Sequence, residues 1–227
     1  MKIKLWDLPL RLFHWALAAS VVSAFVTAKI GGNAMVWHGR AGLAIIGLLA
    51  FRIVWGFTGS THSRFASFIK GPAAIKAYLR GQWHGIGHNP LGALSVLALL
   101  TLLSIQAATG LFANDDISYR GYLSALVSSD TSSRITGIHK LLEPLLMILV
   151  VLHLTAIAFY TRVKKDNLLM PMITGWKNTS EPVEPPRGGS FIAFLIAVLI
   201  GSAAACAASG ALLTPPPPPA AEETPDF

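Results

Sequence analysis

Residues 137–160, GIHKLLEPLLMILVVLHLTAIAFY, form a long apolar run that contains two histidines, His139 and His153. The two histidines are 14 residues apart in the chain (139 to 153). In a helix this spacing corresponds to about 1400°, roughly 40° less than four whole turns, and to a rise of about 21 Å. Both imidazoles are therefore expected on nearly the same face of one helix, at two depths. An ionisable side chain in an apolar helix of membrane length is a candidate for function.

The composition of the chain is that of a membrane protein. Of its 227 residues, 53% are hydrophobic and only 13% are charged, and the mean hydropathy is +0.56. Soluble domains carry about 25% charged residues, so these values disfavour a soluble globule, a disordered chain and a coiled coil. They favour several helices in a bilayer. The single cysteine, Cys206, excludes an internal disulfide, a cysteine-rich zinc site, an iron–sulfur cluster held by this chain alone and a CxxCH haem attachment.

Five segments are apolar over the roughly 20 residues that a membrane span needs. We expect these spans, all of them helical, at about residues 8–28, 36–57, 91–113, 138–159 and 190–213. A cleaved signal peptide is the alternative for the first segment, although His14 and Trp15 interrupt its apolar part. The predicted organisation is a main domain over residues 1–178, a linker at 179–189, an extra transmembrane helix at 190–213 and a proline-rich acidic tail at 214–227.

Lysine and arginine are unequally divided between the two sets of loops. Twelve of them lie in the N-terminal segment, in the loop after the second span and in the segment after the fourth span. The positive-inside rule therefore predicts a cytoplasmic N-terminus and a C-terminus on the outer side. The positive-inside rule then explains most of the net charge of +7, which requires no nucleic-acid partner. Within the loop after the second span, residues 67–79 are expected to form one short helix at the membrane surface.

Four of the seven histidines lie in the predicted spans, and their depths fall into two pairs. His14 and His153 each lie six residues from the cytoplasmic end of their span, which is about 9 Å deep. His38 and His139 lie within two residues of the outer end of theirs. We therefore expect His14 to face His153, and His38 to face His139. A single membrane histidine often only bonds a neighbouring helix, but two depth-matched pairs favour a cofactor.

Two imidazoles from opposite helices suit the axial positions of a haem iron. The porphyrin is apolar and fits between helices, whereas its propionates need cations near the membrane surface. Arg11 and Arg52 are available with Lys4 on the cytoplasmic side, and Arg40 with Lys140 on the outer side. For Arg52, snorkelling of the side chain to the surface is an equal alternative. Zinc or copper is disfavoured because two ligands per site, without cysteine or carboxylate, are too few.

Two further polar residues, Gln106 and Glu143, lie in the third and fourth spans. For Glu143 a role in proton or quinone chemistry competes with a simple interhelical contact, which we favour. The next residue, Pro144, is expected to bend the fourth span. In the fifth span, Gly201 and Ala205 belong to a face of small residues that favours close helix packing, either as a docking helix or as a plain anchor.

Six segments, in order along the chain, resemble the bacterial cytochrome b561 family, which includes the b-type cytochrome subunits of nickel–iron hydrogenases. They are WDLPLRLFHW (6–15), WHGRAGLAIIGLLAFRIVWGF (37–57), SRFASFIKGP (63–72), GHNPLGALSVLALL (87–100), GIHKLLEPLLMILVVLHLTAIAFY (137–160) and KKDNLLMPMITGWK (164–177). The resemblance covers about residues 4–178, so the fifth span departs from the simplest four-helix members.

The resemblance implies a four-helix transmembrane haem-binding bundle with two haem b groups in a bacterial inner membrane, and a periplasmic C-terminus. The family's ligands map onto His14, His38, His139 and His153. Members carry electrons in respiratory chains between the quinone pool and a redox partner, such as a hydrogenase, a dehydrogenase or a cytochrome c. One alternative is a quinone-linked superoxide oxidase, which the acidic outer loops disfavour. The others are a histidine-lined transporter without redox function and a structural anchor.

Overall fold

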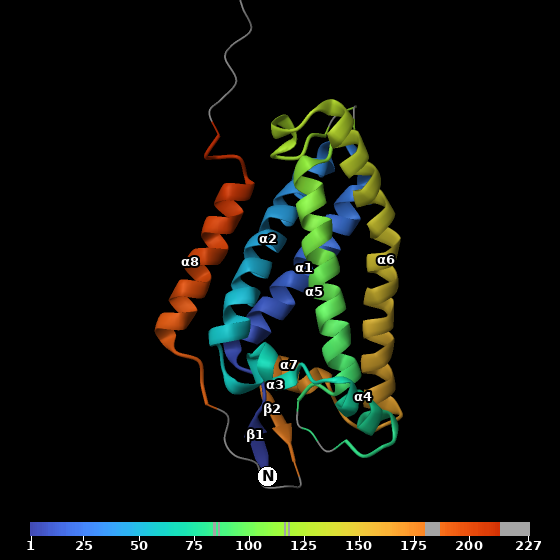
Figure 1. The fold of residues 1–227 in the computed structure, drawn as a ribbon, viewed down its shortest axis with the longest axis vertical. Helices are drawn as coiled ribbons and strands as arrows, with labels where there is room; N and C mark the ends of the chain where they lie inside the picture. Colours follow the sequence, from blue (N-terminus) through green and yellow to red (C-terminus); the bar gives the residue numbers. More distant parts are fainter. Residues whose placement is uncertain (84, 86, 116, 118, 180–186, 214–227) are drawn as a thin grey trace, which may run out of the picture.

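The computed structural model describes residues 1–83, 85, 87–115, 117, 119–179 and 187–213. Within these residues, five helices are long and apolar enough to cross a membrane (Figure 1). They are α1 (Leu8–Ile30), α2 (Met35–Thr58), α5 (Pro90–Phe112), α6 (Ser129–Arg162) and α8 (Phe191–Ala208). This confirms the expected all-α membrane bundle with an additional C-terminal helix. The proposed tail and most of the proposed linker lie outside the described residues.

The two ends of the bundle differ in the short elements that they carry (Figure 1). The N-terminus lies at the end that we call the sheet end. This end carries β1 (Lys2–Lys4), β2 (Trp176–Asn178), η2 (Thr61–Ser63), α3 (Phe65–Phe68), α4 (Pro72–Leu79) and α7 (Leu169–Thr174). The opposite end, the loop end, carries η1 (Gly32–Ala34) and η3 (Ser124–Leu126).

A small sheet, which the sequence did not predict, joins the start of the chain to the segment after the fourth span. β1 pairs antiparallel with β2, and Ile3 lies opposite Lys177. The Leu5 amide then donates to the Gly175 carbonyl at 2.8 Å. Gly175 ends α7 with a φ of 86°, which favours glycine.

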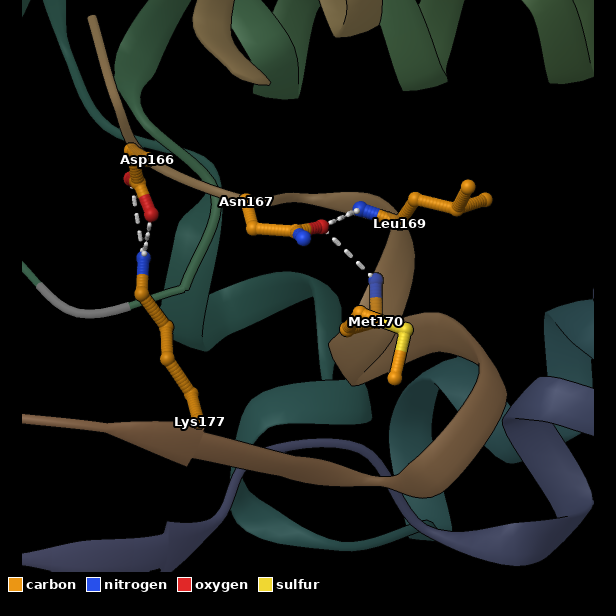
Figure 2. Close-up of polar contacts among 5 residues, drawn as sticks. All are labelled: Asp166, Asn167, Leu169, Met170 and Lys177. Atoms are coloured by element: carbon orange, nitrogen blue, oxygen red, sulfur yellow. Dashed lines mark hydrogen bonds and ion pairs between the residues drawn. The ribbon is translucent and has the colours of Figure 1, made fainter. Parts of the chain in front are cut away.

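The segment between α6 and β2 is held by its own polar side chains (Figure 2). Asp166 and Lys177 form an ion pair at 2.8 Å. The Asn167 side-chain oxygen accepts hydrogen bonds from the Leu169 and Met170 amides at 3.1 and 3.0 Å. These bonds satisfy amides at the start of α7 that have no partner within the helix.

Asp7 is the centre of a polar network at the sheet end. It is the N-cap of α1, and its carboxylate accepts from the Leu10 amide at 2.7 Å. It also accepts from the Trp55 indole at 3.1 Å, the Ser60 hydroxyl at 2.5 Å and the Ser63 hydroxyl at 2.6 Å. The network therefore joins the start of α1 to the end of α2 and to η2.

Helix α6 begins nine residues earlier than the expected start at residue 138. Its first turns are polar, so they do not belong to the apolar run from which the start of the span was predicted. The Ser128 hydroxyl accepts from the Thr131 amide at 3.3 Å, and Asp130 lies in the first turn, where a negative charge is favourable. His139 is consequently ten residues beyond the first residue of α6, not one. The helix continues through Pro144, and the bend expected there stays a prediction.

Two other expected boundaries were wrong. The single helix expected over residues 67–79 is broken into α3 and α4. Pro72 is the first residue of α4, and a proline disfavours the helical conformation in the residue before it. Helix α8 ends at Ala208 rather than near residue 213, because Gly210 adopts a φ of 74°, a common way to end a helix.

Helix α8 packs along α2 (Figure 1). The two backbones come closest where Gly47 faces Gly201. A Cβ added to Gly201 would lie 2.7 Å from the Gly47 carbonyl oxygen, and one added to Gly47 would lie 3.2 Å from the Ala205 Cβ. The small residues of the fifth span thus form the close contact that their spacing predicted.

We predict that Gly201→Val weakens the attachment of α8. The new side chain has to push the two backbones apart, at a cost of about 1–3 kcal/mol. The thermal midpoint of the purified protein should fall in detergent. Ala203→Val, on an exposed part of α8, should leave the midpoint within error. Equal midpoints for both variants would contradict the packing described here.

Candidate functional site

The structure brings the four histidines of the spans together as two pairs. At the loop end, His38 of α2 faces His139 of α6, with ring centroids 6.2 Å apart and planes at 89°. At the sheet end, His14 of α1 faces His153 of α6, with centroids 6.5 Å apart and planes at 49°. These are the two pairings that the depths in the sequence predicted.

The separation of the rings fits one metal ion between each pair. A metal–imidazole bond is about 2 Å long, and the ring centroid lies about 1 Å beyond the nitrogen, so two rings that share an ion have centroids about 6 Å apart. Among the described residues, no group of three or more histidine, cysteine or acidic side chains could hold a metal ion. Two imidazoles with no further protein ligand suit the axial positions of haem iron, because the porphyrin supplies the other four.

Hydrogen bonds orient the loop-end pair, which we define as His38 and His139. The His38 Nδ1 lies 2.8 Å from the Ala24 carbonyl oxygen of α1. The His139 Nδ1 lies 3.0 Å from the Gln106 carbonyl oxygen and 3.2 Å from the Thr109 hydroxyl, both of α5. Nδ1 is therefore the protonated nitrogen in each ring, and Nε2 is the nitrogen that can bind a metal.

A cavity of 410 Å³ opens beside the loop-end pair. Residues of α1, α2, α5 and α6 line it, and apolar surface predominates. Its volume lies within the range of about 300–1,000 Å³ that is typical of cofactor and ligand pockets. At its rim, Lys29 of α1 and Glu143 of α6 form an ion pair at 2.6 Å. Glu143 thus makes the interhelical contact that the sequence favoured.

Gln106 has a closer relation to this site than the sequence indicated. Its side-chain nitrogen lies 3.4 Å from the His139 Nε2, which is at the limit of a hydrogen bond. Its side-chain oxygen is buried and has no hydrogen-bond partner among the described residues. The Gln106 amide group therefore lies next to the His139 nitrogen that can bind a metal.

Two arginines at the sheet end have buried nitrogens without partners in the described part of the chain. Arg52 is only 2% exposed, so its side chain does not snorkel to the surface. Its guanidinium lies over the Phe65 ring at 4.6 Å, and its Nη1 has no hydrogen-bond partner. The Arg11 Nε is likewise buried and unpartnered. A buried cation without a paired carboxylate is costly, so this end of the bundle fits an anionic group such as a haem propionate.

Arg40 and Lys140, the cations expected at the other side of the membrane, are both exposed. The Arg40 guanidinium lies over the Trp37 ring at 4.7 Å, one turn along α2. Lys140 lies at the rim of the cavity beside the loop-end pair. Lys140 is therefore nearer to the loop-end pair, and a role for Arg40 stays a prediction.

His88, just before α5, lies close to the sheet-end site, although it is not one of the four histidines in the predicted spans. Its ring lies between Trp6 and Phe68, with centroids 4.7 and 4.9 Å away. Its Nδ1 is buried without a partner among the described residues. Burial, together with the nearby positive charge of Arg52, lowers the pKa of His88 to about 4, and His88 is close enough to interact electrostatically with His153 and His14. The neutral imidazole therefore lies beside the sheet-end pair, which we define as His14 and His153.

An α-helical membrane bundle with an imidazole pair near each end has the architecture of a membrane-bound b-type cytochrome. The sequence profile of the prokaryotic cytochrome b561 family matches residues 5–175, and the chain belongs to this family. It is therefore a multi-pass prokaryotic membrane protein, a b-type cytochrome that binds haem b and takes part in electron transfer.

Two relatives have similar sequences over most of their length. One is a probable Ni/Fe-hydrogenase B-type cytochrome subunit of Azotobacter chroococcum mcd 1. It is 25% identical over 222 residues, and the match covers 77% of this chain and 88% of the relative's chain. The other carries the same name in Azotobacter vinelandii and is 26% identical over 214 residues, with the same two coverages. No solved structure matches the chain.

We predict that His88 makes the stability of the protein depend on pH. Its pKa is about 4 in the folded state, whereas an unfolded histidine titrates near 6.5. The unfolded chain therefore binds more protons between these values, and stability falls as the pH falls from about 6.5 to 4. The thermal midpoint of His88→Phe, which keeps an aromatic ring between Trp6 and Phe68, should decline less than that of the unchanged protein over this range. Parallel declines would contradict the assignment.

Proposed function

We propose that the protein carries electrons across the membrane through two haem b groups, one held by each histidine pair. The observation that carries this proposal is the repeated spacing of the imidazoles, 6.5 Å at the sheet end and 6.2 Å at the loop end. Both spacings suit a six-coordinate iron with two axial histidines. A bound haem supplies a one-electron carrier. A haem held by two histidines in this way would have no open position at its iron for oxygen or another substrate.

In this proposal the chain positions the haems and sets their surroundings. His38 and His139 are oriented by their bonds to α1 and α5, so their Nε2 atoms face the space between the helices. The apolar lining of the cavity excludes water from that site, which lowers the local dielectric constant and influences the potential. At the sheet end, Arg52 and Arg11 offer unpartnered donors to propionates. At the loop end, Lys140 and Arg40 are the corresponding candidates.

The proposed redox partners are based on the expected orientation in the membrane and on the names of the two relatives. The distribution of lysine and arginine supports an orientation with the sheet end in the cytoplasm and the loop end in the periplasm. We propose that quinone exchanges electrons with one haem and a redox protein with the other. Because the two relatives are named as cytochrome subunits of Ni/Fe-hydrogenases, a hydrogenase is the proposed redox partner.

We predict that single histidine variants separate the two haems. His153→Ala should remove the sheet-end haem, and His139→Ala should remove the loop-end haem. In each variant the haem would be held by only one histidine of its pair. The pyridine haemochrome count should fall from two to one per chain in either variant. His62→Ala, a change in a partly buried histidine of η2, should keep both haems.

The double variant His139→Ala, His153→Ala is the second part of this test. Because its two substitutions fall in different pairs, it should retain no haem. A folded single variant that keeps two haems, or a double variant that keeps one, would contradict the proposed pairing.

A further inference from the structure

We propose that Arg52 and His88 together bind one propionate carboxylate of the sheet-end haem, and that the short helix α3 holds both side chains in place for it. This inference rests on the proposed function, since it requires a haem between His14 and His153. It adds a haem-binding residue that is not one of the four paired histidines. It also gives α3 a role that neither the sequence nor the relatives assign.

The first observation is that two buried donors lack an acceptor. The Arg52 Nη1 and the His88 Nδ1 are buried, and neither has a hydrogen-bond partner within the described parts of the chain. Arg52 is only 2% exposed, so its charge is removed from bulk water. An arginine nitrogen can only donate, and the Nδ1 of a neutral imidazole can carry the ring proton. Because buried polar groups are normally hydrogen-bonded, the two donors indicate an acceptor, and the charge of Arg52 favours an anionic one.

Helix α3 places the two donors near each other. The Arg52 guanidinium lies over the Phe65 ring at 4.6 Å, and the His88 ring lies 4.9 Å from the Phe68 ring, with Trp6 as its other neighbour at 4.7 Å. Phe65 and Phe68 are the first and last residues of α3, and their ring centroids are 5.9 Å apart. One helical turn thus supports both donors, and the electrostatic interaction between Arg52 and His88 agrees with this proximity.

Helix α3 is itself fixed against α2. A Cβ added to Gly56 of α2 would overlap the Phe65 ring, so this glycine makes room for the ring. The Arg64 Nε, just before α3, donates to the Gly59 carbonyl at the end of α2 at 2.8 Å. The donors therefore rest on a support that is already in place before a ligand binds, which reduces the entropy lost on binding.

The nearby carboxylate of the protein does not fill this role. Asp7 is close enough to interact electrostatically with Arg52, but the two form no ion pair among the residues that the structure describes. The Asp7 oxygens accept hydrogen bonds from a backbone amide, an indole and two hydroxyls instead. Arg52 is therefore left to pair with an anion from outside the chain.

The position of the donors favours a haem propionate over a free anion. His88 interacts electrostatically with both His14 and His153, so the two donors lie beside the sheet-end pair. A haem b bound there brings two carboxylates with it. Charge-assisted hydrogen bonds from the guanidinium and the imidazole would hold one of them. Arg11, three residues before His14 in α1 and with a buried, unpartnered Nε, is the candidate for the other.

Two substitutions of His88 separate its hydrogen bond from its packing. His88→Phe keeps a ring and removes the donor, whereas His88→Asn removes the ring and keeps an N–H on the atom next to Cγ, where Nδ1 lies. Each is made in His139→Ala, which should hold only the sheet-end haem, and the loss of haem to an excess of apomyoglobin is followed by absorbance. We expect His88→Phe to lose haem about tenfold faster, because a hydrogen bond to a charged group is lost, and His88→Asn to lose it more slowly than His88→Phe. The reverse order would show a packing role and overturn the inference.

Two controls limit the effect to one haem and one histidine. In His153→Ala, which should hold only the loop-end haem, His88→Phe should leave the rate of haem loss unchanged. His62→Phe, which changes another histidine of the sheet end, should leave the rate unchanged in His139→Ala. The propionate-bending bands in the resonance Raman spectrum of His139→Ala should shift with His88→Phe and not with His62→Phe. Equal acceleration of haem loss at both ends, or unmoved bands, would overturn the inference.

A double-substitution cycle tests whether Arg52 and His88 bind the same carboxylate. Arg52→Gln and His88→Phe are combined in His139→Ala, and the rates of haem loss are compared. The joint acceleration should be smaller than the product of the two single accelerations, because groups that share a partner are coupled. A joint acceleration equal to that product, in a chain that binds two haems, would overturn this inference alone. Fewer than two haems in the unchanged chain would overturn the proposed function as well.

Discussion

The structure depends on two pairs of imidazoles. In each pair, one histidine of α6 faces one histidine of α1 or α2 across the space between these helices. The close helix packing of the described bundle joins α1 to α2, α2 to α5 and α8, and α5 to α6. Helix α6 therefore approaches α1 and α2 mainly through its side chains, and these include both of its histidines. A flat apolar cofactor between the paired imidazoles would fill this space. The cofactor would then be part of the core, and its binding would hold the two halves of the bundle together.

Polar contacts close this space at both ends. At the sheet end, the network around Asp7 ties α1 to α2, and the pairing of β1 with β2 ties the N-terminus to the segment after α6. At the loop end, the Lys29–Glu143 ion pair joins α1 directly to α6. These contacts lie at the two ends of the bundle, so its apolar middle is left to the helices and would be left to a bound cofactor. Helix α8 lies outside this arrangement and covers the far side of α2 (Figure 1).

The spans and the histidine pairs could be predicted because both depend on simple spacing. Apolar length defines a span, and position within a span defines the depth of a histidine. The polar start of α6 could not be found in this way, although Ser128 and Asp130 are typical helix-start residues. The strands β1 and β2 are three residues each. They form only because residues 174 positions apart meet in the fold (Ile3 opposite Lys177, 177 − 3 = 174).

The parts of the site that escaped prediction depend on contacts between distant segments. His88 lies in a loop by sequence, and only the fold places it between Trp6 and Phe68. The acceptors of the loop-end histidines include the backbone carbonyls of Ala24 and Gln106. Because every residue has a backbone carbonyl, the residue type does not show which one accepts a hydrogen bond. Arg52 was recognised as a candidate, but its burial, which decides between snorkelling and anion binding, required the structure.

In the proposed arrangement, each of the two histidine pairs binds one haem b. The most direct measurement is a pyridine haemochrome count on the purified full chain, together with a dithionite-reduced minus oxidised absorbance spectrum. We expect two b-type haems per chain, both low-spin and six-coordinate. One haem or none, in folded protein produced with sufficient haem, would contradict it.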